Sequence, residues 1–331
     1  MRKLCEKERR VIQALEFSPS EPVTELAIRA QMRVATFRYH ARSLIDRHIL
    51  RPLSLINPFA LGYYPYCVYF NLSSLGRKKR ECVLESLARN NSVSWLASLG
   101  GSFQYCARFL AKTPSDVLLS LSMIQGTLGG VFAEKAISPV LAHSFFPAKF
   151  AHATREPEAE RGFSADDKVC EIDSIDARIL KLFANNECGS MREIARRLGL
   201  PSSTVDDRIK RLQSKRVLLE GLYVLNEKAL GMTSCRLLVK SSGFSPKGSA
   251  AFFDFLKGHS YVSSMFYCLG SWDCEVQCLA ADGDIIERLV SEIETNFGDE
   301  IIGIEQIFVH QKLKENSFPF DSAADDLRAA G

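Results

Sequence analysis

Two segments of the chain carry polar and basic side chains on one face of an expected helix, which suits contact with a nucleic acid. The first begins near Val34 and the second near Ser202. The polar side of the first carries Arg33, Thr36, Arg38, Tyr39, His40 and Arg42. The polar side of the second carries Ser202, Ser203, Thr204, Asp206, Asp207, Arg208, Lys210 and Arg211.

These residue types match what double-stranded DNA offers. Arginine can bind guanine through two hydrogen bonds, whereas serine, threonine and tyrosine commonly bind a base or a phosphate. A helix in the major groove places the residues near its N-terminus at the base edges. Both segments are therefore predicted to bind DNA, and the first is expected to contribute more positive charge.

Each segment also has one feature that departs from this chemistry. In the second, Asp206 and Asp207 can accept a hydrogen bond from cytosine, but carboxylates are also repelled by phosphate. A solvated face, or one of ion pairs, is the alternative interpretation there. In the first, Gln31 stands where the second has the turn glycine Gly199. Since glycine adopts tight turns readily, we expect a distorted turn at Gln31.

The elements around the second segment follow a helical pattern and then a strand pattern. Asp173 and Ser174 suit a helix N-terminus. Apolar residues recur at helical spacing in three stretches: Ile175, Ile179, Leu182 and Phe183; Ile194, Ala195 and Leu198; and Val205, Ile209 and Leu212. Residues 217–219 and 222–225, separated by the polar pair Glu220-Gly221, are expected to form a β-hairpin. Three short helices and a hairpin predict a winged helix-turn-helix.

The first half of the chain repeats the second at an offset of 168 residues. Thr36 aligns with Thr204 and Leu44 with Leu212. After each helical part, the apolar pattern changes to the order βαββαβ, which is the ferredoxin-like plan. In the first half these elements are expected at 64–72, 78–90, 93–99, 103–111, 115–128 and 137–145. In the second half they are expected at 235–240, 249–257, 261–269, 273–280, 285–297 and 304–313.

The predicted fold class is α+β, with two tandem units that each contain a winged helix-turn-helix followed by a ferredoxin-like domain. The first unit is expected to divide into residues 1–56 and 57–146, and the second into residues 171–226 and 227–316. Residues 147–170 are rich in Ala, Glu, Pro and Arg without an apolar period, so they are interpreted as a linker.

This sequence resembles the leucine-responsive regulatory protein (Lrp/AsnC) family. The second half carries the resemblance in IDSIDARILKLF, MREIARRLGLPSSTVDDRIKRLQSKRVL, LNEKALG and LGSWD. The first half is a weaker copy, seen in TELAIRAQMRVATFRYHARSLIDRHIL and INPFALG. The resemblance implies a DNA-binding transcriptional regulator, and two copies in one chain depart from the single copy of ordinary members.

The resemblance also implies an effector site and a mode of assembly. In the family, the loop between the second and third ferredoxin-like strands helps to bind an amino acid or a related metabolite. The matching residues are Gly270, Trp272 and Asp273, although they can equally serve only to shape a turn. Family members dimerise through this domain, so the two copies are expected to pair within one chain as a pseudo-dimer. Pairing between chains is the alternative, and further homo-oligomerisation is expected.

The composition is consistent with a DNA-binding protein of the cytoplasm. Residues 1–150 hold 20 Lys and Arg against 10 Asp and Glu, whereas the remaining residues hold 22 against 29. A basic half suits a polyanionic partner. No apolar run is long enough for a membrane helix, and Met1–Arg10 lacks a signal-peptide core. The ten cysteines include no Cys-x-x-Cys pair, so reduced thiols and no metal site are expected.

An enzyme of the same fold is the second class of function to weigh. Siroheme decarboxylases share it, and they carry a His- and Arg-bearing strand segment that the matching stretches 93–110 and 261–280 lack except for Arg108. No other catalytic set or cofactor motif is recognised, so we expect no enzyme activity and no cofactor. A third interpretation is a module that keeps protein contacts and has lost DNA binding.

Overall fold

The computed structural model describes residues 4–74, 76–154, 160–185 and 191–320. In the first copy, the helix-turn-helix consists of α1 (Glu6–Leu15), α2 (Val23–Arg29) and α3 (Val34–Asp46), followed by β1 (Leu50–Ile56). In the second copy, the matching elements are α6 (Ser174–Ala184), α7 (Met191–Leu198), α8 (Ser202–Ser214) and β7 (Leu218–Leu225). Each set encloses its own apolar core, around Phe37 and Leu44 in the first and around Val205 and Leu212 in the second.

Both ferredoxin-like domains have the predicted βαββαβ order. After the short helix η1 (Phe59–Leu61), the first contains β2 (Tyr64–Leu72), α4 (Arg77–Arg89), β3 (Val93–Gly100), β4 (Tyr105–Ala111), α5 (Pro114–Leu128) and β5 (Phe132–Phe145). After α9 (Glu227–Leu230), the second contains β8 (Thr233–Ser241), α10 (Pro246–Gly258), β9 (Val262–Cys268), β10 (Cys274–Ala280), α11 (Gly283–Phe297) and β11 (Ile301–Glu315). The fold class is therefore the predicted α+β.

The strands of the two copies join into one closed barrel. The described strands follow the order β2-β4-β3-β11-β8-β10-β9-β5, and β5 pairs with β2 to close the ring. Two long strands make the connection, because β5 pairs with β2 and then with β9, and β11 pairs with β8 and then with β3. Closure leaves these strands without an open edge. The two copies thus pair within one chain, which is the arrangement expected from the sequence.

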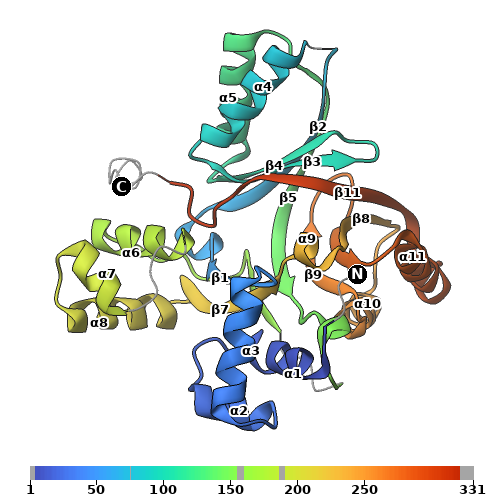
Figure 1. Cartoon of the computed structure of the whole chain (residues 1–331). Coiled ribbons are helices and arrows are strands. Elements are labelled where there is room, and N and C mark those ends of the chain that lie inside the picture. The colour runs from blue at the N-terminus through green and yellow to red at the C-terminus, as the bar shows by residue number, and fades with distance from the viewer. Residues whose placement is uncertain (1–3, 75, 155–159, 186–190, 321–331) are drawn as a thin grey trace.

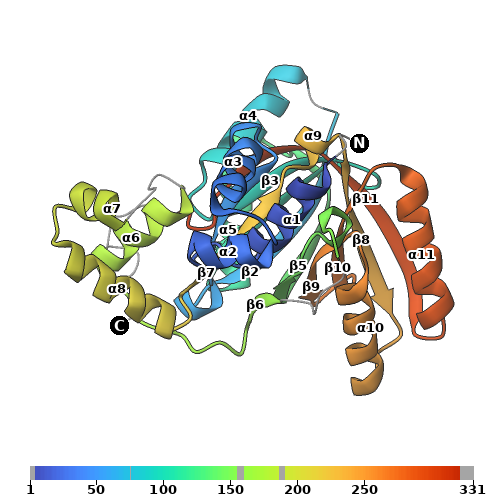
Figure 2. The same ribbon diagram turned by 60° about the horizontal axis from the view of Figure 1, so that its bottom comes forward.

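Apolar side chains fill both faces of the barrel strands. Helices α4 and α5 cover the outer face of one copy and α10 and α11 that of the other (Figure 1). The inner face holds a second core in which Tyr69, Trp95, Phe266, Trp272 and Ile307 are buried. Figure 2 shows α10 and α11 side by side along the outside of their strands. The two helix-turn-helix units lie beyond one end of the barrel, with β1 and β7 between them (Figure 1).

The predicted wing hairpin is wrong. Residues 218–225 form the single strand β7, which pairs antiparallel with β1 of the other copy. Glu220 and Gly221 oppose the single residue Ser54, so the polar pair forms a β-bulge where a turn was expected. A Cβ on Gly221 would lie 2.9 Å from the carbonyl oxygen of Leu53, which explains why glycine stands at this close crossing. The wings of the two copies therefore form one shared sheet.

The segment that joins the copies is folded onto them in its described parts. Its short helix η2 (Lys149–Ala151) contacts α1, where the Ala148 N–H donates to the Glu16 carboxylate at 3.0 Å. Further along, β6 (Arg161–Ser164) pairs with β5. Residues 155–159 lie outside the described part of the chain. The linker expected from composition therefore contributes a buried contact and a strand.

The turn at Gln31 keeps the geometry of its glycine counterpart, so the expected distortion is absent. Gln31 has a φ of 54° and Gly199 a φ of 67°, so both are left-handed. This conformation costs a residue with a Cβ about 1–2 kcal/mol. The first copy tolerates that cost at Gln31, and the second avoids it.

We expect Gly199→Gln to lower the free energy of unfolding by about 1 kcal/mol, because the new side chain must adopt the left-handed conformation. A Cβ at Gly199 meets no atom within 4 Å, so crowding adds nothing. Urea unfolding followed by circular dichroism measures the change. The matched control is Gly130→Gln, at a glycine with the same open surroundings and no left-handed φ. Equal stability of the two variants would contradict the prediction.

Candidate nucleic-acid interface and ligand cavity

Helix α3 presents an exposed basic face without internal neutralisation at its first turns. Arg33 and Arg38 are exposed and form no ion pair with any residue that the structure describes. Arg42 lies 3.6 Å from Asp46, and both side chains are mostly in solvent, so this pair is weak. Tyr39 is 70% exposed, and its ring meets the edge of His40 with the centroids 5.2 Å apart. Thr36 is half-buried at the start of the helix.

Helix α8 differs because acidic side chains already hold its cations. Arg208 Nη1 lies 2.6 Å from Asp173 Oδ2 and 2.9 Å from Asp176 Oδ1, both on or beside α6. Arg211 also pairs with Asp176, and Lys210 Nζ lies 2.6 Å from Asp206 Oδ2. Partial burial raises the pKa of Asp173, but hydrogen bonds from Arg208 and from the backbone outweigh it and hold the pKa below its usual value.

Asp206 therefore forms an ion pair within α8, which is the alternative considered for the two aspartates. Asp207 is exposed. Ser202 and Ser203 are exposed at the start of the helix, and Thr204 is half-buried. Of the two helices, α3 offers the cations that are free of an internal partner.

The three residues of the expected effector loop face different surroundings. Gly270 has a φ of +137°, and a Cβ there would lie 3.2 Å from the carbonyl oxygen of Ile137, so the turn needs glycine. Trp272 is 5% exposed in the inner core of the barrel. Asp273 is exposed, and its Oδ2 accepts hydrogen bonds from the backbone N–H and the hydroxyl of Ser241 at 2.6 and 3.0 Å. None of the three lines the cavity that lies between the barrel strands and the β1–β7 sheet.

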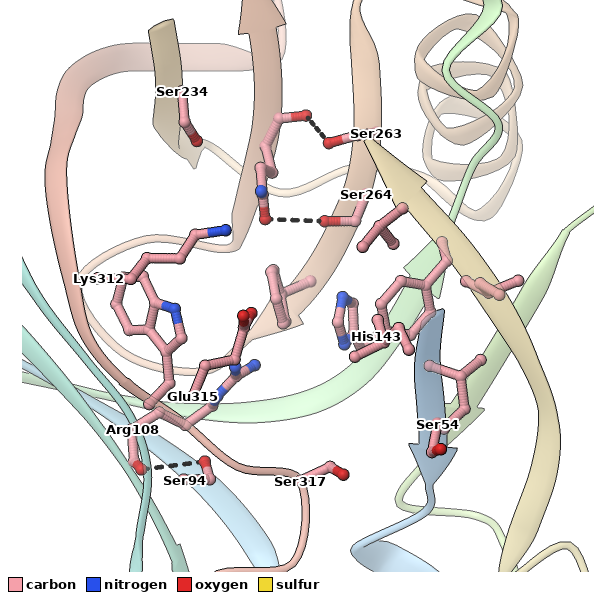
Figure 3. A pocket seen from close by; sticks show the side chains of 18 of the residues that line it. Ser54, Ser94, Arg108, His143, Ser234, Ser263, Ser264, Lys312, Glu315 and Ser317 are labelled. Carbon is pink, nitrogen blue, oxygen red and sulfur yellow. Dashed lines mark hydrogen bonds between the residues drawn. The ribbon is translucent and has the colours of Figure 1, made fainter. Parts of the chain in front are cut away.

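That cavity lies at the end of the barrel nearest the helix-turn-helix units. Barrel strands of both copies form its floor, and β1 and β7 form its roof (Figure 3). Its volume is about 190 Å³. Both copies contribute side chains, and Figure 3 shows Arg108, His143, Lys312 and Ser264 around the same space.

Three nitrogen-bearing side chains of the floor surround the ring of Phe266. Arg108 Cζ and Arg236 Cζ each lie 5.7 Å from its centroid, and the His143 ring stacks on it with centroids 3.8 Å apart. Arg236 Cζ is also 4.1 Å from the Trp95 ring centroid. Burial, together with the nearby charges of Arg108 and Arg236, holds the pKa of His143 well below its usual value, so the imidazole is neutral at pH 7.

One end of Arg236 is fixed by a buried network inside the barrel. Its Nη1 donates to Glu275 Oε2 and to the Tyr69 hydroxyl, each at 3.2 Å. The Tyr69 hydroxyl donates to Glu275 Oε2 at 2.9 Å, and the Trp272 indole N–H donates to Glu275 Oε1 at 3.2 Å. Arg236 is 4% exposed and Glu275 is fully buried. The network joins both copies, since Tyr69 belongs to the first.

Sequence reasoning did not single out His143, Arg236 or Ser234 as site residues. His143 lies on β5, and Ser234 and Arg236 lie two residues apart on β8. All three are buried, and a polar side chain in a largely apolar part of a strand was the available signal. Their convergence depends on the pairing of β5 with β9 and of β8 with β10, which brings residues of two copies together.

Two further observations bear on the function. No described helix is long and apolar enough to cross a membrane. Among the described residues, no group of three or more His, Cys, Asp or Glu side chains is placed to hold a metal ion.

Comparison with known proteins agrees with the fold and with the helix-turn-helix. The AsnC-type helix-turn-helix domain matches residues 172–213. The HTH-type transcriptional regulator FL11 of Pyrococcus abyssi is 37% identical over 149 residues, which are 44% of this chain and 94% of that protein. The HTH-type transcriptional regulator Ptr1 of Methanocaldococcus jannaschii is 26% identical over 121 residues, or 37% of this chain and 80% of that protein.

Nearly the whole chain also resembles solved structures of a siroheme decarboxylase. The siroheme decarboxylase NirDL has a TM-score of 0.62 and 13% identity, with 95% of this chain and 94% of that chain covered. At this identity the likeness shows the fold alone. The helix-turn-helix and its relatives define a transcriptional regulator. The chain belongs to the Lrp/AsnC family.

Proposed function

We propose that this regulator binds DNA sequence-specifically as a pseudo-dimer, with α3 of the first copy supplying most of the base and phosphate contacts. The observation that carries the proposal is the exposed face of α3, where Arg33 and Arg38 have no acidic partner in the described chain. Helix α8 supports the asymmetry, because Arg208 and Lys210 already pair with acids on the same unit. Neutralised cations gain less from phosphate than free ones do.

A filter-binding titration with random double-stranded DNA at several salt concentrations tests DNA binding itself. Each neutralised phosphate contributes a slope of about −0.9 to the plot of log K against log salt. Arg33 and Arg38, together with Arg42, whose exposed pair with Asp46 is weak, predict a slope of about −3. A flat plot, or no binding at low salt, would favour the alternative of a module that has lost DNA binding.

We further propose that a small effector, amino-acid-like by family resemblance, modulates DNA binding through the loop at Gly270, Trp272 and Asp273. The exposed carboxylate of Asp273 supports this, since it has room for a donor besides Ser241. Asp273→Ala is expected to abolish stabilisation by the effector in a thermal-shift screen of the amino acids. Ser241→Ala is the control, because it removes one internal contact and keeps the carboxylate. An equal response of wild type and Asp273→Ala would place the effector elsewhere.

A siroheme-decarboxylase-like enzyme is the second candidate, favoured by the likeness to NirDL along the whole chain and by Arg108 and His143 in the cavity. The sequence argues against it, because the matching stretches 93–110 and 261–280 contain no histidine and only one arginine, Arg108. Absorbance spectroscopy after mixing with siroheme tests it, and we expect no spectral change and no loss of carboxylate groups.

A further inference from the structure

The cavity at the end of the barrel has a polar floor with donors that remain unpaired. His143 Nε2, Ser234 Oγ and Arg236 Nε are buried and have no hydrogen-bond partner among the described residues. Their side chains are 7%, 2% and 4% exposed, and all three line the cavity. A buried donor without a partner is costly, so such groups mark a place where a binding partner gains most. Arg108 adds a cation that forms no ion pair with a described residue.

The carboxylates around the same cavity are already engaged. Glu16 accepts from the Ala148 N–H and lies 2.8 Å from His152 Nε2. Glu315 pairs with Arg51 at 2.6 Å, and Glu227 pairs with Lys312 at 3.1 Å. The floor therefore offers unpaired hydrogen-bond donors and one unpaired positive charge. The described carboxylates around the cavity already have partners, so none is free to bind an ammonium group. This balance favours an anion over an amino acid.

The roof of the cavity is mostly apolar, since Ser54 and Arg51, which pairs with Glu315, are the polar β1 residues that line it. Leu53 and Leu55 of β1 pack with Leu222 and Val224 of β7 in a small core of their own. A molecule that fills about 190 Å³ can reach from the charged floor to this roof with a single ring or a branched chain. Pockets with an apolar wall and a few placed polar groups are typical of small-molecule sites.

We propose that this cavity binds a small organic carboxylate with one ring or a branched chain, such as a 2-oxo acid. The carboxylate lies on the floor, where Arg108 supplies the charge and Arg236, His143 and Ser234 supply hydrogen bonds. The apolar body contacts the roof. This site is separate from the loop at Asp273, and its ligand class differs from the amino acid expected there.

The position of the roof links this site to DNA binding. Strand β1 starts at Leu50, shortly after α3 ends at Asp46, and β7 starts at Leu218, shortly after α8 ends at Ser214. A ligand that packs against both strands therefore contacts the connection between the two recognition helices. This consequence rests on the proposed regulatory function, whereas binding itself is measurable without DNA.

Isothermal titration calorimetry of the full chain with phenylpyruvate and with phenylalanine tests the proposal. Both probes have the same ring and a carboxylate. Phenylpyruvate carries a 2-oxo group where phenylalanine carries an ammonium group. We expect phenylpyruvate to bind with a Kd below about 1 mM and phenylalanine to bind at least about tenfold more weakly. Acetate, which has no apolar body, is expected to bind more weakly than phenylpyruvate by a similar factor.

Arg108→Gln is expected to weaken phenylpyruvate binding at least about tenfold, because it removes the free positive charge and keeps most of the side-chain volume. Arg77→Gln, on the outer surface of α4, is the matched control and should leave the affinity unchanged. Leu222→Ala is a second test, because it removes apolar side-chain atoms from the roof and leaves the charged floor intact. It should also weaken phenylpyruvate binding.

Three results would overturn the proposal: no binding of phenylpyruvate, equal affinity for phenylalanine, or unchanged affinity in folded Arg108→Gln. Failure of the regulatory function is a separate outcome. It would appear as phenylpyruvate binding that follows these expectations in a protein that does not bind DNA.

Discussion

Replacing Arg38 with alanine is expected to weaken binding to the selected DNA site by about 5- to 150-fold. A bidentate contact between an arginine and guanine is worth about 1–3 kcal/mol, which corresponds to that range. Arg38 is exposed on the face of α3 and has no acidic partner in the described chain, so the wild-type side chain breaks no internal ion pair to reach DNA. Fluorescence anisotropy at fixed salt measures the change, and Arg42→Ala is expected to weaken binding as well.

Lys210→Ala in α8 is the matched control for Arg38→Ala. Lys210 is also a cation on a recognition helix, but it lies 2.6 Å from Asp206 one turn away. Its removal is expected to change the affinity by about twofold or less, since the pair contributes little net charge. A larger loss in Lys210→Ala than in Arg38→Ala would show that the second copy dominates, contrary to the proposed asymmetry.

The second large effect concerns the stability of the barrel. Glu275→Ala is expected to lower the free energy of unfolding by about 3–5 kcal/mol, because it leaves the guanidinium of Arg236 buried without its counter-ion. Arg236 is 4% exposed, and the hydrogen bonds of Trp272 and Tyr69 to the same carboxylate are lost as well. Urea unfolding followed by the fluorescence of the two tryptophans reports on the region directly.

The double variant Arg236→Met/Glu275→Leu tests the cause of that loss. It removes both charges, so it is expected to be more stable than Glu275→Ala, as often happens when apolar side chains replace a buried ion pair. Arg77→Ala is the surface control, at an exposed pair with Glu81 that contributes less than about 1 kcal/mol. If the double variant were as unstable as Glu275→Ala, the loss would come from packing alone.

Much of the fold could be predicted because its signals are local. Apolar residues at helical spacing, such as Val205, Ile209 and Leu212, identified the helices of each helix-turn-helix. The offset of 168 residues then transferred the interpretation to the weaker first copy. The strands of the ferredoxin-like domains were found within a few residues of their ends, and the largest difference is β5, which begins at Phe132 where residue 137 was expected.

The features that sequence reasoning missed all depend on contacts between distant parts of the chain. Glu220-Gly221 looks like a turn by composition, and only the presence of β1 opposite makes it a bulge in a continuous strand. The cavity also depends on contacts between distant parts of the chain, because Arg108, His143 and Arg236 lie on three different strands of two copies. Local apolar periodicity predicts the helices and strands themselves. It does not predict which of them pack or pair with one another in the fold.

Selection of binding sites from random double-stranded DNA, with the full chain, tests the proposed function most directly. The two recognition helices differ, with Arg38-Tyr39-His40 in α3 where α8 has Asp206-Asp207-Arg208, and both belong to one pseudo-dimer. We therefore expect an asymmetric consensus in which one half-site is strongly specified and the other weakly. Arg38→Ala should relax the strong half-site and leave the weak one unchanged. A strongly palindromic consensus, or no enrichment of any sequence, would contradict this account.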